Sequence, residues 1–180
     1  MLEIVPTLNF YVALAGIFGQ LVTVGLILAF FLRSRSEVAR SIVQFTGERG
    51  LLLAFLASLG ASILTLFYSE TIGFTPCPLC WWQRVFLYPQ VVLLGMALWK
   101  KDSYVAEYSI ALSVFGFFVA MYQHLLQVLP DSGLPCPATG ASCSIRILFE
   151  FGYVTYPLLA ATLFAFLIVV MGLVCSRRAS

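Results

Sequence analysis

The sequence predicts an all-α integral membrane protein with five spanning helices, and two observations lead to this fold class. Of the 180 residues, 61% are hydrophobic and only 10% are charged, whereas a soluble domain carries roughly 25% charged residues. A water-soluble domain of this size could not bury so much apolar surface, because small domains expose a large share of their area. The apolar residues also form long runs, and a helix needs about 20 such residues to cross ~30 Å of hydrocarbon.

Five apolar stretches supply the predicted helices. They cover residues 8–32, 51–69, 85–99, 104–126 and 153–174. The third stretch is short, so we expect its helix to begin nearer Cys80 or Trp81. In the second, Ala54, Ser58 and Ser62 recur every four residues. Such a stripe of small side chains lets a neighbouring helix approach closely.

The basic residues predict how the chain is oriented in the membrane. If successive helices alternate in direction, eight of the ten Lys and Arg residues lie on one side: Arg33, Arg35, Arg40, Arg49, Lys100, Lys101, Arg177 and Arg178. The other side receives Arg84 and Arg146. Basic residues favour the cytoplasmic side. The N-terminus and the loops after the second and fourth stretches are therefore expected outside the cytoplasm, and the C-terminus inside.

The first stretch is expected to remain as an anchor. Glu3 but no Lys or Arg precedes it, whereas a cleaved signal peptide has a basic start and an apolar core of only 7–15 residues. The segment that follows, residues 36–47, carries Val38, Ile42 and Phe45 among its polar residues. Either a short amphipathic helix on the inner membrane surface or an ordinary charged loop fits this pattern.

Four of the five cysteines form two close pairs in the outer loops. The first pair lies in Cys77-Pro-Leu-Cys80-Trp-Trp-Gln-Arg84. Two cysteines at this spacing can change between dithiol and disulfide with little backbone motion. A helix N-terminus and a nearby cation both stabilise thiolate, and Arg84 lies one turn beyond Cys80. Redox activity is therefore predicted, with a structural disulfide or half of a zinc site as alternatives.

The second pair, Cys136 and Cys143, lies in a segment rich in proline, glycine and small residues. This composition predicts an exposed, mobile loop. Alone, the pair would suggest a structural disulfide, but a thiolate of either pair can attack the disulfide of the other. A four-cysteine zinc site is disfavoured by the spacing and by an oxidising compartment, so no metal is expected. Cys175, at the inner end of the last stretch, is expected to be reduced and to pack.

These residues resemble the DsbB/BdbC family of bacterial disulfide-bond formation proteins. The run from Cys77 to Arg84 is similar to that family's quinone-proximal motif. The run Tyr122-Gln-His124-Leu-Leu-Gln127, followed by a loop cysteine, is similar to the end of its third helix. The resemblance covers about residues 50–174. It implies a four-helix transmembrane bundle of DsbB type, to which this chain adds one extra N-terminal transmembrane helix.

The resemblance also divides the chain into three parts. Residues 1–50 are expected to form an N-terminal transmembrane anchor and a cytoplasmic basic loop. Residues 51–175 form the four-helix redox core, and residues 176–180 form a cytoplasmic tail. The role of the first part is left open, because the family core has no such helix.

The resemblance implies a thiol:quinone oxidoreductase of the bacterial cytoplasmic (inner) membrane. Cys77 and Cys80 would be the pair that quinone oxidises, either ubiquinone or menaquinone, and Arg84 would be the cation beside that quinone. Cys136 and Cys143 would take electrons from a soluble thioredoxin-fold thiol oxidase of the DsbA type. The expected partners are this oxidase, the membrane quinone pool and the lipid bilayer.

His124 is the only histidine, near the outer end of the fourth stretch. An ionisable residue inside a spanning segment suggests a function. We expect His124 to donate a hydrogen bond to a quinone carbonyl or to handle its protons. The alternative is a histidine that hydrogen-bonds a neighbouring helix.

Other functions fit the sequence less well. It has no glycine-rich phosphate loop and no basic–aromatic stripe, so no nucleic-acid partner is expected. A vitamin K epoxide reductase-like enzyme also couples cysteine pairs to a quinone, but there the loop pair precedes the C-x-x-C. A non-catalytic membrane protein with two structural disulfides is the remaining alternative. It would show neither bound quinone nor thiol-dependent quinone reduction.

Overall fold

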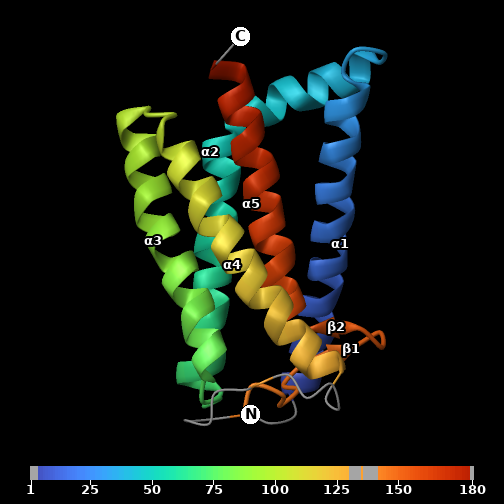
Figure 1. Cartoon of the computed structure of the whole chain (residues 1–180), viewed down its shortest axis with the longest axis vertical. Helices are drawn as coiled ribbons and strands as arrows, with labels where there is room; N and C mark the ends of the chain where they lie inside the picture. The colour runs from blue at the N-terminus through green and yellow to red at the C-terminus, as the bar shows by residue number, and fades with distance from the viewer. Residues whose placement is uncertain (1–3, 130–134, 136–141, 179–180) are drawn as a thin grey trace.

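The computed structural model describes residues 4–129, 135 and 142–178. In chain order its elements are α1 (Ile4–Leu32), α2 (Glu37–Leu66), the π-helical turn η1 (Phe67–Thr71), α3 (Pro78–Lys100), α4 (Val105–Val128), the strands β1 (Phe149–Glu150) and β2 (Val154–Thr155), and α5 (Tyr156–Arg178). The long helices run side by side, and the antiparallel strand pair lies at one end (Figure 1). The predicted all-α membrane fold with an extra N-terminal helix is confirmed.

Four helices in the described part of the chain are long and apolar enough to cross a membrane. They are Val5–Leu32, Glu37–Thr71, Val105–Val128 and Tyr156–Arg178. The remaining helix, α3, has 23 residues, which at 1.5 Å per residue extend about 35 Å. It is more polar than the others because it carries Gln83 and Gln90, and both are buried inside the bundle. Polar side chains that face the bundle interior are compatible with a spanning helix.

The segment between the first two predicted helices forms the start of α2. Ser36 caps this helix, since its Oγ accepts a hydrogen bond from the Ala39 backbone N–H at 3.4 Å. The first turns of α2 cross one end of the bundle before the helix turns down along its neighbours (Figure 1). Val38, Ile42 and Phe45 are exposed on these turns, as an amphipathic helix on a membrane surface requires. The stripe formed by Ala54, Ser58 and Ser62 is buried, as predicted.

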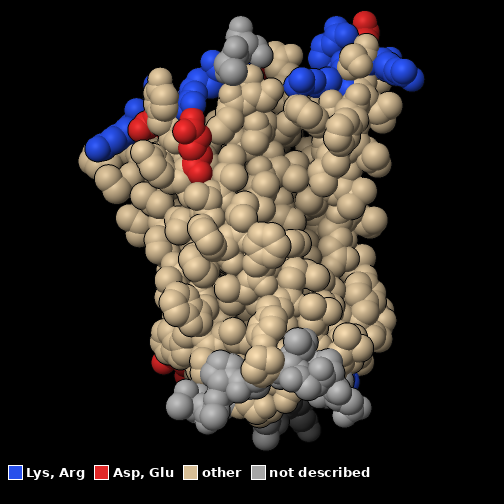
Figure 2. Space-filling model, viewed as in Figure 1, with Lys and Arg blue, Asp and Glu red and all other residues tan. Residues whose placement is uncertain are grey.

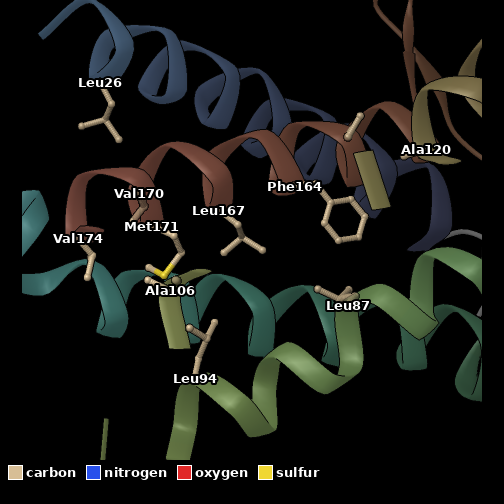
Figure 3. Close-up of a cluster of buried hydrophobic side chains, with 12 residues drawn as sticks. Leu26, Leu87, Leu94, Ala106, Ala120, Phe164, Leu167, Val170, Met171 and Val174 are labelled. Atoms are coloured by element: carbon tan, nitrogen blue, oxygen red, sulfur yellow. The ribbon is translucent and has the colours of Figure 1, made fainter. Parts of the chain in front are cut away.

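Helix α5 is the central helix of the bundle. It packs against α1, α2 and α4, while α3 packs against α2 and α4. Figure 3 shows Phe164, Leu167 and Met171 of α5 within the buried core. At Gly116 of α4, an added Cβ would lie 2.5 Å from Cζ of Phe164. The glycine therefore lets this aromatic ring lie directly on the α4 backbone, a close approach that small residues permit in membrane bundles.

Most of the charged residues visible in Figure 2 lie at the end of the bundle that carries the C-terminus. At this end Arg177 forms a salt bridge with Glu48 at 3.1 Å, and Arg178 forms one with Glu107. Helix α3 begins at the opposite end (Figure 1). The chain is thus a multi-pass membrane protein whose two ends differ strongly in charge.

Candidate active site

The first cysteine pair forms the N-terminal end of α3. Cys77 is the N-cap residue, and Pro78 occupies the first helical position, where its fixed φ and missing N–H favour a helix start. The Cys77 Sγ accepts a hydrogen bond from the Cys80 backbone N–H at 3.3 Å. The two sulfur atoms lie 2.7 Å apart. The pair therefore lies at the positive end of the helix dipole, as the sequence predicted.

The two sulfurs of this pair have different electrostatic environments. The hydrogen bond with Cys80, followed by burial, raises the pKa of the Cys77 thiol well above its usual range. Of the two sulfurs, Cys77 therefore holds its proton more tightly.

Gln123 of α4 contacts both sulfurs. Its Nε2 donates to Sγ of Cys77 at 3.1 Å and to Sγ of Cys80 at 3.3 Å. Its Oε1 accepts a hydrogen bond from Gln83 Nε2 at 2.6 Å, which turns the amide N–H groups toward the sulfurs. Gln123 is 2% exposed, and a buried donor of this kind stabilises a thiolate. Sequence analysis missed this residue, although it interrupts an apolar stretch beside His124.

Cys80 lines a cavity of about 360 Å³. The walls come from α2, η1, α3, α4, α5 and the segment that follows Cys143, and include Leu87, Leu163 and Phe164. Ligand pockets typically combine such apolar walls with a few well-placed polar groups. The cysteine pair of α3 thus lies directly beside a space that can hold an apolar ligand.

Arg84 lines the same cavity. Its Nη2 donates to the Thr65 carbonyl oxygen at 2.9 Å, and its guanidinium lies 5.3 Å from the centre of the Trp81 ring. Thr65 is near the end of α2, just before the π-helical turn η1, and such turns are frequent at functional sites. The guanidinium has five N–H donors. Within the described part of the chain it makes this one hydrogen bond, so other N–H groups can reach a ligand in the cavity.

Two further polar groups line the wall, and sequence analysis gave neither a role in the site, although Gln127 belongs to the run that resembles the family. The Tyr156 hydroxyl and Gln127 Oε1 are buried and have no hydrogen-bond partner among the described residues. A buried polar group without a partner is destabilising by about 1–3 kcal/mol. A ligand that offers an acceptor to the Tyr156 hydroxyl would remove that penalty. Nothing in the local sequence marks Tyr156, which is simply the first residue of α5.

Cys143 lies beside the first pair. It forms a buried cluster with Cys77 and Leu126, against which Cys80 and Tyr122 pack. The second cysteine pair was expected in an exposed, mobile loop, and for Cys143 this prediction was wrong, because its side chain is 0% exposed. Its expected partner, Cys136, lies outside the described residues.

Hydrogen bonds to α4 explain why Cys143 is buried. Gln127 Nε2 donates to the carbonyl oxygens of Cys143 at 3.4 Å and Ile145 at 2.9 Å. Arg146 Nε donates in turn to the Gln127 carbonyl oxygen at 2.7 Å. The Arg146 bond satisfies one carbonyl at the C-terminal end of α4, and the three bonds together hold the segment against this helix. Composition alone does not reveal such long-range partners.

His124 does not line the cavity. Its Nδ1 lies 2.8 Å from Oγ1 of Thr155 in β2, which corresponds to the alternative of a histidine bonded to a neighbouring element. The structure thus brings together Cys77, Cys80 and Arg84, places Cys143 next to them, and leaves His124 outside. Cys175 packs against the main core near the other end of α5, as expected for a packing residue.

Comparison with known proteins agrees with this geometry. A family model described as disulfide bond formation protein DsbB matches residues 47–176. The chain belongs to the DsbB family. It is 41% identical to a probable disulfide formation protein of Metapseudomonas resinovorans over 130 residues, covering 71% of this chain and 89% of that protein. It is 35% identical to disulfide bond formation protein C of Bacillus subtilis over 127 residues, covering 70% and 89%.

No solved structure gives a significant match to the chain. The family match begins inside α2, so α1 precedes it. Family membership and the apolar helices identify a membrane protein of disulfide bond formation, with oxidoreductase activity.

The contacts of Gln123 predict its effect on thiol reactivity. In a Cys77→Ser background, Gln123→Leu should slow alkylation of Cys80 at neutral pH by roughly tenfold, because a hydrogen bond to a charged group is worth about 1.5–3 kcal/mol. Alkylation by iodoacetamide, followed by mass spectrometry, measures this rate. The control is His124→Leu, which changes the next residue without touching the sulfurs. Equal rates in the two variants would show that Gln123 does not stabilise the thiolate.

Proposed function

We propose that this protein is a thiol:quinone oxidoreductase. It would reoxidise a soluble thioredoxin-fold thiol oxidase of the DsbA type and pass the electrons to the membrane quinone pool. The observation that carries the proposal is the shared cavity: Cys80 and Arg84 line one apolar space at the end of the bundle. A protein with only structural disulfides has no need of a cation and an apolar cavity beside the cysteine pair.

The residues of the cavity fit a quinone head group. Its volume of about 360 Å³ lies in the usual range of ligand pockets, roughly 300–1,000 Å³. A quinone has two carbonyl oxygens, which are acceptors, and an apolar ring. Arg84 offers guanidinium N–H groups, and Tyr156 offers a buried hydroxyl that has no other partner among the described residues. Leu87 and Phe164 supply apolar walls, and both ubiquinone and menaquinone fit this chemistry.

A quinone bound here supplies the final oxidant, because it takes up two electrons and two protons to become a quinol. A DsbA-type partner has a reduction potential near −120 mV, so only an acceptor of similar or higher potential can reoxidise it. Arg84 would stabilise the thiolate of Cys80 and negative charge that develops beside it. Gln123 would hold the two sulfurs in position throughout.

Electrons would enter through the loop pair. Cys143 is buried, so a bulky partner would reach Cys136, and a partner thiolate would attack the Cys136–Cys143 disulfide at that sulfur. The Tyr122 hydroxyl donates to the Pro135 carbonyl at 2.7 Å, and Tyr122 packs against the Cys143 cluster, so the residue before Cys136 is held by α4. The second thiol of the partner then displaces Cys136. The partner leaves as a disulfide, and both loop cysteines are reduced.

Electrons would next pass from Cys143 to Cys77, because these two side chains share one buried cluster. The Cys143 thiolate attacks the Cys77 sulfur of the Cys77–Cys80 disulfide, and Cys80 leaves as a thiolate beside Arg84. The Cys136 thiolate then attacks Cys143. This step restores the loop disulfide and leaves Cys77 and Cys80 as a dithiol that holds both electrons.

The charge distribution supports one orientation of this machinery. The strongly charged end of the bundle would face the cytoplasm, and both cysteine pairs would face the other side. Both pairs would then lie on the side of the oxidising compartment, where disulfides persist.

The orientation predicts which cysteines react from outside. A membrane-impermeant maleimide added to intact cells after reduction should label at least one of Cys77, Cys80, Cys136 and Cys143, and should not label Cys175. Mass spectrometry of the purified protein identifies the labelled peptides. Labelling of Cys175 alone would show the inverted orientation.

The cavity predicts which side chains bind quinone. Arg84→Ala and Tyr156→Phe should both raise the apparent KM for ubiquinone-1. The increase should be roughly tenfold or less for Tyr156→Phe and larger for Arg84→Ala, since hydrogen bonds from charged groups are stronger. Tyr108→Phe is the matched control, because Tyr108 is exposed on α4. Steady-state quinone reduction in detergent gives the KM values. If neither variant changed KM or turnover, these two residues would have no part in quinone binding.

The relay predicts a trapped intermediate. In a Cys80→Ser variant, Cys77 cannot form its usual disulfide, so a disulfide between Cys77 and Cys143 should accumulate. Non-reducing peptide mapping detects it, and a Cys80→Ser, Cys143→Ser double variant is the control. A partner trapped on Cys77 in the unmodified chain, and never on Cys136, would mean that the roles of the two pairs are reversed.

A further inference from the structure

Helix α1 lies outside the segment that matches the family, yet it packs closely against the core. Ala13 is 0% exposed. A Cβ at Gly16 would collide with the Leu159 side chain of α5, so the two helices approach closely at this point. An anchor that only inserts the chain into the membrane would not require such close packing.

Asn9 connects α1 to two walls of the quinone cavity. The Tyr68 hydroxyl donates to Asn9 Oδ1 at 2.5 Å, and Asn9 Nδ2 donates to the Ile147 carbonyl oxygen at 3.0 Å. Both Tyr68 and Ile147 line the cavity. Asn9 is 7% exposed and Tyr68 is 4% exposed. One buried amide thus uses its acceptor for one wall and its donor for the other.

The two walls held by Asn9 carry different parts of the site. Tyr68 lies in η1, and its ring packs edge-on against Tyr156 with the ring centres 5.1 Å apart. It also stacks on Phe74 with the centres 6.2 Å apart. Tyr68 therefore helps to position the ring of Tyr156, a residue that lines the cavity and whose buried hydroxyl has no partner among the described residues. Ile147 lies four residues after Cys143, in the segment held against α4.

We propose that Asn9 is a positioning residue of the quinone cavity, and that α1 is a part of the site rather than an anchor alone. The proposal rests on the quinone function proposed above and assigns a role to the helix that precedes the family core. Without the Asn9 amide, the Tyr68 hydroxyl and the Ile147 carbonyl lose their buried partner. The hydroxyl end of the Tyr68 ring is then no longer fixed by a hydrogen bond, and the Tyr156 ring that packs against Tyr68 can shift with it.

The expected consequence is a change in affinity for quinone. Tyr156 and Arg84 would hold the head group, so a displaced Tyr156 weakens binding and raises the KM. The thiol exchange steps involve sulfurs that Asn9 does not contact, so turnover at saturating quinone should remain close to that of the unmodified protein. A purely structural role for α1 would instead lower the amount of active protein, and hence kcat, without changing the KM.

Three variants and a control test the proposal. Asn9→Leu removes both hydrogen bonds, Tyr68→Phe removes one and keeps the ring, and the double variant combines them. Gln20→Leu is the matched control on the same helix. Gln20 donates to Thr162 of α5 at 3.3 Å and accepts a hydrogen bond from the Tyr153 hydroxyl at 3.4 Å, and none of these residues lines the cavity. This control therefore reports on the docking of α1 without a contact to the cavity walls.

Ubiquinone-1 reduction with dithiothreitol as donor gives KM and kcat in detergent, and equilibrium dialysis gives the dissociation constant for ubiquinone-1. Asn9→Leu and Tyr68→Phe should each raise both the KM and the dissociation constant roughly threefold to tenfold, the range expected for lost buried hydrogen bonds. The double variant should bind ubiquinone-1 no more weakly than Asn9→Leu, because both substitutions remove the hydrogen bond between Tyr68 and Asn9. Gln20→Leu should stay within about twofold of the unmodified protein.

An unchanged dissociation constant in both Asn9→Leu and Tyr68→Phe would overturn the proposal. So would an equal increase in Gln20→Leu, since docking alone would then explain the effect. If Asn9→Leu failed to fold, as judged by gel filtration and thermal unfolding, Tyr68→Phe would decide the question. An unmodified protein that binds ubiquinone-1 without reducing it would refute the proposed function, and the dissociation constants would still decide the role of Asn9.

Discussion

The amide of Gln123, near the C-terminal end of α4, donates hydrogen bonds to the two cysteine sulfurs at the start of α3. The geometry of this cysteine pair depends on it. Its two N–H bonds reach one sulfur each, while Gln83 fixes the direction in which the amide points. An amide buried in an apolar bundle has no water to compete with these bonds, so they are stronger and more directional than at a surface. The pair of sulfurs is therefore held by two helices, although both cysteines belong to one.

The membrane explains why this arrangement lies at one end of the bundle. Polar groups are expensive in hydrocarbon and gather near the ends of spanning helices or face the bundle interior. Gln90 shows the second solution, since it is 0% exposed and its amide bonds Ser109 and Ser113 across the α3–α4 interface. The cavity combines both solutions. It presents apolar walls, and it is also lined by residues on either side of Cys143, among them Ser142 and Ile145.

The burial of Cys143 bears on the proposed relay, in which the two loop cysteines would have different tasks. A residue that packs against Cys77 is positioned to exchange a disulfide inside the protein, but a bulky partner would not reach it. Thiol–disulfide exchange depends on access and on which sulfur is attacked, so the proposal gives the contact with the partner to Cys136. Gln127 and Arg146 maintain this burial because they hold the Cys143 segment against the end of α4.

Local sequence was sufficient to predict the parts of the candidate site whose residues lie close together in the chain. Cys77, Cys80 and Arg84 fall within three turns of chain, and a helix start at Pro78 places them at one helix end whatever the rest of the molecule does. Apolar runs predicted the helices because a bilayer imposes a minimum length on any spanning segment. The small-residue stripe of α2 was readable for the same reason, since its spacing follows the helical repeat.

Only the tertiary structure decided which side chains from other helices join this site. His124 and Gln123 are adjacent in sequence and lie at the same membrane depth, but successive residues of a helix point about 100° apart, so one faces the cysteines and the other faces Thr155. The sequence indicates how deep in the membrane a residue lies, but it does not indicate how its helix is rotated about its own axis. Asn9, Tyr156 and Cys143 reach the site through contacts between segments far apart in the chain, and the rotation of each helix about its axis is set by packing against its neighbours.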